Sequence, residues 1–175
     1  MKAIKLMSSF ILSTTLALGI STSASAAVMS LSNGLYGEAN VGYGNVTTTA
    51  NRNNGFAGSV MLGYKFNEYF AIDGGYTILP KGHVSTHYPS LALKGIWPLG
   101  NGDWDFFAKG GVAAVRGQKN STLAADTNAA FYYGAGFTYW FQQDFGLVIQ
   151  GTGTMATTNN IPQTYTITTG LTYFF

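Results

Sequence analysis

The chain has 175 residues, no Cys, and 9% charged residues, of which 9 are basic and 7 acidic. This length favours a single domain, and the lack of Cys excludes disulfides and thiolate metal sites. Soluble domains carry about 25% charged residues, so a chain this poor in charge and rich in Gly, Tyr, Phe and Thr suits a surface that faces lipid.

The first 26 residues have the pattern of a secretory signal peptide. A basic start is followed by an apolar middle at residues 10–20 and by a small-residue pattern that ends at Ala26. We predict cleavage between Ala26 and Ala27, which leaves 7 basic and 7 acidic residues in the mature domain, residues 27–175. The apolar run is shorter than the roughly 20 residues of a spanning helix, which argues against a retained anchor.

The mature chain predicts eight β-strands, because apolar residues alternate with small or polar ones. The last segment illustrates the pattern: Tyr165, Ile167 and Leu171 share one face, and threonines fill most of the other. These segments reach the roughly 9–11 residues that a transmembrane strand needs. The predicted strands cover residues 35–44, 55–66, 69–79, 85–97, 103–116, 128–141, 144–154 and 163–175.

The connections between these segments alternate in length. Short turns follow the second, fourth and sixth segments, whereas the polar connections at 44–54, 80–84, 117–127 and 155–162 are mostly longer. Short periplasmic turns and longer external loops are typical of outer-membrane barrels, and an even strand number leaves both termini in the periplasm. The sequence therefore predicts an all-β, eight-stranded antiparallel up-and-down transmembrane β-barrel. A soluble β-sandwich, the alternative, would carry charge on its second faces.

Most aromatic residues fall on the apolar faces, near the strand ends, as in the girdles of membrane barrels. The exceptions are Tyr36, Tyr69, Tyr88, Phe107, Tyr132, Trp140 and Phe174.

Four charged residues fall on the predicted inner faces at similar depth: Glu38, Asp73, Lys94 and Lys109. Two acids and two bases predict a neutralising network. Asp73 and Lys94 lie on neighbouring strands, so they could pair directly. Because eight strands leave an interior that side chains fill, we expect this network to brace and plug the barrel. The alternative is a narrow, low-conductance channel gated by the same charges.

Two histidines and a serine lie at the connection between the third and fourth predicted strands: His83, Ser85 and His87. Outer-membrane enzymes that modify lipid A use His, Ser and an acid near the barrel rim, and a Ser nucleophile needs a base oriented by a third group. Asp126 is the only acid expected on that side. We therefore prefer a polar loop, and predict no catalytic residue, cofactor or metal.

Basic residues near the long connections include Arg52, Arg116 and Lys119. Such groups could contact the phosphates of lipopolysaccharide, although solvated loops are the plainer interpretation. The sequence contains no dinucleotide fingerprint, phosphate loop or nucleic-acid-binding patch.

Three sequence segments resemble those of a known family: LYGEANVGYGN at 35–45, GFAGSVMLGYKFNEYFAIDGGYT at 55–77, and the terminal GLTYFF. They are similar to the small OmpA-like outer-membrane β-barrel family, which includes OmpX, Ail and the opacity proteins. The resemblance covers the whole mature chain and implies an outer-membrane location with a structural or surface role. It also implies that the barrel-assembly machinery reads the last strand, where Tyr173 and Phe175 match the family pattern. External loops would be available to a host or environmental ligand.

Overall fold

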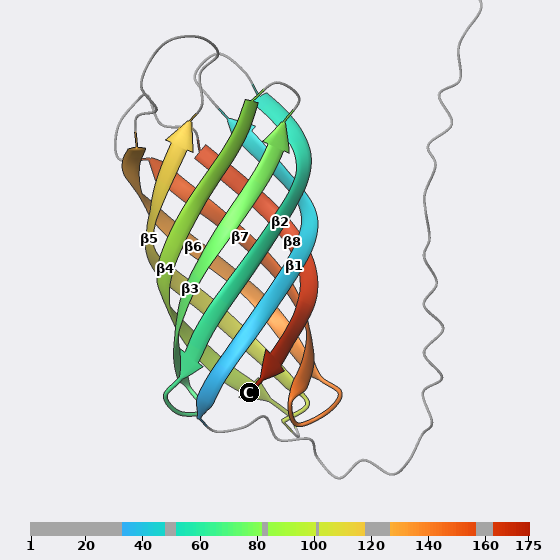
Figure 1. Ribbon diagram of the computed structural model, residues 1–175. Coiled ribbons are helices and arrows are strands. Elements are labelled where there is room, and N and C mark those ends of the chain that lie inside the picture. The colour runs from blue at the N-terminus through green and yellow to red at the C-terminus, as the bar shows by residue number, and fades with distance from the viewer. Residues whose placement is uncertain (1–32, 48–51, 82–83, 101, 118–126, 157–162) are drawn as a thin grey trace, which may run out of the picture.

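The described residues form eight β-strands that close into one barrel (Figure 1). The structure, a computed structural model, describes residues 33–47, 52–81, 84–100, 102–117, 127–156 and 163–175. Within these ranges no helix is long and apolar enough to cross a bilayer. The strands are β1 (Gly34–Thr47), β2 (Arg52–Lys65), β3 (Phe70–Lys81), β4 (Val84–Leu99), β5 (Trp104–Gly117), β6 (Thr127–Trp140), β7 (Phe145–Ala156) and β8 (Gln163–Phe174).

Each strand pairs antiparallel with its neighbours in sequence, and β8 pairs with β1 to close the ladder. This last pairing runs from Tyr36 opposite Phe174 to Thr47 opposite Gln163. Closure leaves no free sheet edge along that seam. The C-terminus lies at the end of the barrel where β2 leads into β3, β4 into β5 and β6 into β7, called here the turn end; the opposite end is the loop end (Figure 1). The predicted eight-stranded barrel is confirmed.

The two faces of each strand differ as the alternation predicts. On β8, Ile167 and Leu171 are 73% and 52% exposed on the outside, whereas Thr166 and Thr172 are 3% exposed inside. A large apolar outer surface with a small and hydroxylated interior is the reverse of a soluble sandwich, and matches the outward apolar band of a membrane barrel.

Several strands extend further toward the loop end than the sequence predicts. Residues 45–47 and 52–54, expected in a loop, continue the β1–β2 ladder, with Asn45 opposite Asn54 and Thr47 opposite Arg52. Asn has a low strand propensity, but here the Asn45 amide donates to the Asn54 side chain at 2.6 Å, which supports the extended pairing. Residues 80, 81 and 84 were also expected in a connection and lie in strands, with Pro80 opposite Ser85 and Lys81 opposite Val84.

The β1–β8 seam depends on glycine. A Cβ atom at Gly42 would overlap the Ile167 carbonyl, and one at Gly170 would overlap the Ala39 carbonyl. Glycine is used where another backbone approaches closely, so these residues let the first and last strands close tightly.

Candidate functional site in the barrel lumen

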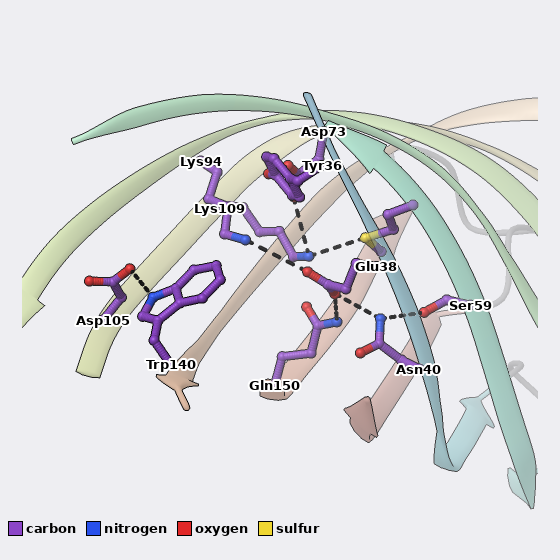
Figure 2. A network of polar contacts seen from close by, with 11 residues as sticks. Tyr36, Glu38, Asn40, Ser59, Asp73, Lys94, Asp105, Lys109, Trp140 and Gln150 are labelled. Atoms are coloured by element: carbon purple, nitrogen blue, oxygen red, sulfur yellow. Dashed lines mark hydrogen bonds and ion pairs between the residues drawn. The ribbon is translucent and has the colours of Figure 1, made fainter. Parts of the chain in front are cut away.

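A layer of buried charged side chains crosses the middle of the lumen (Figure 2). Glu38 comes from β1, Asp73 from β3, Lys94 from β4 and Lys109 from β5, and all four are 3–6% exposed. Charged groups are rarely buried unless they are paired. The contacts of these four residues therefore decide what the lumen can do.

The layer contains two ion pairs, which differ from the expected one. Lys94 Nζ lies 3.7 Å from Glu38 Oε2, and Lys109 Nζ lies 3.7 Å from Asp73 Oδ2. The direct pairing of Asp73 with Lys94 is absent from the described contacts, so that expectation is wrong.

Strand register explains the difference. On the β3–β4 ladder Asp73 lies opposite Ala92, while Lys94 lies opposite Ala71. Lys94 is also the direct cross-strand partner of Lys109 on β5. Like charges placed directly opposite each other repel, and each lysine instead meets a carboxylate from another part of the barrel wall.

Neutral side chains hold the two carboxylates in place. Gln150 Nε2 and Asn40 Nδ2 donate to Glu38 Oε1 at 2.6 and 2.7 Å, and Asn40 also contacts Ser59 Oγ at 3.2 Å. The Tyr36 hydroxyl donates to Asp73 Oδ1. Hydrogen bonds to an ionised group are the stronger ones, so these neighbours fix one oxygen of each acid.

Each lysine ammonium group also contacts an uncharged side chain, an aromatic ring or a thioether sulfur. Lys94 Nζ lies 4.2 Å from the centre of the Phe107 ring, a cation–π distance. Lys109 Nζ lies 3.4 Å from the Met61 sulfur. The second carboxylate oxygens, Glu38 Oε2 and Asp73 Oδ2, accept no hydrogen bond from the described residues. In each acid, therefore, hydrogen bonds hold one carboxylate oxygen, whereas the other oxygen has only the ion pair with its lysine.

Aromatic rings fill the lumen below this layer, at the turn end. The Phe174 ring lies 5.4 Å from both the Tyr36 and Trp140 rings. Trp140 Nε1 donates to Asp105 Oδ2 at 2.8 Å, and Lys65 lies over the Phe174 ring. The space that remains among them is about 20 Å³, room for roughly one water molecule.

A second packed layer fills the lumen at the loop end. Tyr88 and Tyr132 are 0% and 1% exposed, and Leu79 and Val115 pack in the same cluster. Threonine hydroxyls pair along β7 and β8, with Thr152 and Thr166 2.6 Å apart. The described lumen is thus filled on both sides of the charges.

Seven aromatic residues were predicted to lie off the apolar faces of the strands, and no role was predicted for them. The structure buries Tyr36, Tyr88, Phe107, Tyr132, Trp140 and Phe174 in the lumen, while Tyr69 is 50% exposed in a turn. Lys65, Asp105 and Gln150, which were not predicted to join the charge network, are also buried on the inner faces. Strand alternation was the available signal for all of them.

The rim residues of the enzyme hypothesis are only partly described. His83 and Asp126 lie outside the described residues, as does Lys119, and only the backbones of Ser85, Arg52 and Arg116 are described. His87 is half-buried, and its ring lies 5.9 Å from that of Tyr76. In the described ranges, no three His, Asp or Glu residues gather as metal ligands would.

The terminal aromatic residues lie on the outer surface. Tyr173 and Phe175 are 39% and 70% exposed, and their rings are 5.2 Å apart. The Phe175 amide donates to the Leu35 carbonyl at 3.0 Å, which extends the β1–β8 seam. Ala26 and Ala27 lie outside the described residues, so the signal cleavage stays a prediction.

Solved outer-membrane barrels share this fold. Neisserial surface protein A is 12% identical over 81% of this chain and 97% of its own, with a TM-score of 0.66. The N-terminal barrel of Pseudomonas aeruginosa OprF is 15% identical over 82% and 99%, with a TM-score of 0.60. Yersinia pestis Ail, solved with the heparin analogue sucrose octasulfate, is 14% identical over 81% and 99%, with a TM-score of 0.56.

At such low identities these likenesses show the fold alone. No curated protein sequence matches the chain. The sequence does match the Outer membrane protein beta-barrel domain family over residues 13–175. With the closed antiparallel ladder and the lipid-compatible outer face, this match shows that the chain belongs to the outer-membrane protein β-barrel family.

Proposed function

We propose that this protein is a sealed, internally braced barrel that supports the bacterial outer membrane and presents its loop end at the cell surface. The observation that carries the proposal is the filled lumen. Two ion pairs cross its centre, and the Phe174–Trp140–Tyr36 rings and the Tyr88–Tyr132 layer pack below and above them. An eight-stranded barrel has little free interior, and the packing of these layers supports a lumen closed to solutes.

The proposed orientation places the turn end and both termini in the periplasm. It is supported by the short turns at this end, which in outer-membrane barrels face the periplasm. In this proposal residues 1–26 direct export and are removed between Ala26 and Ala27. The loop end would then face lipopolysaccharide and any host or environmental ligand. Ail was solved with a heparin analogue, which makes anionic glycans a reasonable first class to test.

Conductance in planar bilayers tests the sealed barrel. We expect the purified wild-type protein to give no current steps above the lipid background, because packed layers lie on both sides of the charges. A narrow gated channel is the second candidate, favoured by Glu38 Oε2 and Asp73 Oδ2, which face their lysines without accepting a hydrogen bond from the described residues. Wild-type current steps whose size changes in Lys94→Ala or Asp73→Ala would establish the channel and overturn the sealed barrel.

We also propose that Tyr173 and Phe175 form the signal read by the barrel-assembly machinery. Both rings are exposed at the turn end of the last strand. We expect Phe175→Ala to lower the amount of folded protein in the outer membrane several-fold, while refolding of the purified protein into detergent changes little. Phe141→Ala, which removes another exposed ring at the turn end, is the matched control. Equal losses in both assays, or in both variants, would show that Phe175 acts through stability alone.

A further inference from the structure

The outer face of β4, β5 and β6 carries an apolar hollow at the turn end, called here the turn-end hollow. It is lined by Leu99, Gly100, Trp104 and Phe137. Leu99 ends β4 and lies opposite Trp104, the first residue of β5. A Cβ atom at Gly100 would have no heavy atom within 4 Å apart from its chain neighbours. The β4–β5 turn therefore leaves open space beside the strand wall.

Large apolar side chains around the turn-end hollow are close to half exposed. Leu99, Trp104 and Phe137 are 43%, 47% and 45% exposed. Neighbouring rings support two of them, since the Trp104 ring lies 4.8 Å from that of Tyr139 and the Phe137 ring lies 5.3 Å from that of Phe106. These side chains belong to the outward apolar band, which faces hydrocarbon in a membrane barrel. The occupant that such walls suit is an acyl chain of a lipid.

The charged groups at the turn end select among lipids. Each of the three turns carries one acid: Glu68 and Asp144 are exposed and Asp103 is half-buried. Lys65, at the same end, is only 2% exposed. Among the side chains that the structure describes, the surface of the turn end therefore presents acids alone. Charges act over a Debye length of about 8–10 Å, so this end repels an anionic headgroup and attracts an ammonium group.

Asp103 is the acid closest to the turn-end hollow along the chain, because it directly precedes Trp104. An ammonium group donates hydrogen bonds, and those between ammonium and carboxylate are among the strong ones. We propose that the turn-end hollow binds one aminophospholipid of the phosphatidylethanolamine class, with an acyl chain against Trp104 and Phe137 and the ammonium group on Asp103. In the proposed orientation this lipid lies in the periplasmic leaflet.

Native mass spectrometry of the full chain, released from nanodiscs of phosphatidylethanolamine, phosphatidylglycerol and phosphatidylcholine in equal parts, tests the headgroup half of the site. We expect wild type to retain phosphatidylethanolamine several-fold more than the other two lipids. Phosphatidylglycerol is anionic, and the quaternary ammonium group of phosphatidylcholine donates no hydrogen bond. Asp103→Asn should lower this retention about threefold, in the range of a partly exposed ion pair. Asp144→Asn removes an exposed acid from another turn and should leave retention unchanged.

Two leucines of equal exposure test the acyl-chain half of the site. Leu99 and Leu35 are both 43% exposed on the outer face at the turn end, but only Leu99 lines the turn-end hollow. We expect Leu99→Ala to lower phosphatidylethanolamine retention about twofold, because only van der Waals packing is lost within hydrocarbon. Leu35→Ala should leave retention as in wild type.

Three results would overturn the site. Equal retention of the three lipids by wild type would show unspecific contact, and equal losses in Asp103→Asn and Asp144→Asn would show a response to the overall charge of the turn end. Displacement of the lipid by glycerophosphoethanolamine, which has no acyl chains, would show that the turn-end hollow contributes nothing. Heat-dependent gel mobility confirms the folding of each variant, and Asp103→Ser replaces Asp103→Asn if the latter does not fold.

This experiment is independent of the proposed function. Both leaflets of the nanodisc have the same composition, so retention does not depend on which end of the barrel faces the periplasm. Current steps in planar bilayers would count against the sealed barrel and leave the lipid site unaffected.

Discussion

Lys94→Met is expected to lower the free energy of unfolding by about 3–5 kcal/mol, the usual cost of removing one partner of a buried ion pair. The substitution leaves the Glu38 carboxylate 3% exposed and without its cation. Asn40 and Gln150 would still donate to Glu38 Oε1, but Oε2 would have neither its ion-pair partner nor a hydrogen bond from the described residues. Urea titration of the barrel in lipid vesicles, followed by heat-dependent gel mobility, measures the change.

The double variant Lys94→Met with Glu38→Gln shows whether Lys94→Met loses stability through the unpaired Glu38 charge or through lost packing of the Lys94 side chain. A neutral amide at position 38 keeps an oxygen for Asn40 and Gln150 and no longer needs a cation. Replacing both members of a buried ion pair is often nearly neutral, so we expect the double variant to recover most of the lost stability. A double variant no more stable than Lys94→Met would contradict the ion pair as the cause.

Phe174→Ala is expected to cost about 3–5 kcal/mol and to open the turn end of the lumen. The Phe174 ring is 3% exposed and contacts both Tyr36 and Trp140. Without it, a cavity would join the small space that already lies beside Lys65 and Asp105. Urea titration measures the stability, and acrylamide quenching of Trp140 in a Trp97→Phe, Trp104→Phe background measures the opening.

The matched control for this variant is again an outward ring. Phe141 is 46% exposed, so Phe141→Ala should cost less and leave Trp140 as protected as before. Unchanged quenching of Trp140 in Phe174→Ala would show that the Phe174 ring does not seal the lumen.

Strand alternation in the sequence was enough to predict which residues face inward. It placed Glu38, Asp73, Lys94 and Lys109 on inner faces, and the same rule covers Phe174 and Gln150. A period of two depends only on the local backbone, which is why a single sequence carries it.

The partners of these residues could not be predicted in the same way. Whether Lys94 meets Asp73 or Glu38 depends on the stagger between strands and on which walls of the barrel approach each other, and both are properties of the closed barrel. Strand ends were also missed, since residues 45–47 and 52–54 look like a loop by composition yet continue the ladder.

The adjacent lysines on β4 and β5 have a consequence for assembly. Neither Lys94 nor Lys109 can be neutralised by the other, and their acids come from β1 and β3. A slip of one residue in a ladder turns a whole strand over, which would send a charge into hydrocarbon. We therefore expect the two ion pairs to favour the correct register, because a slipped strand would leave at least one of these four charges without its counterion.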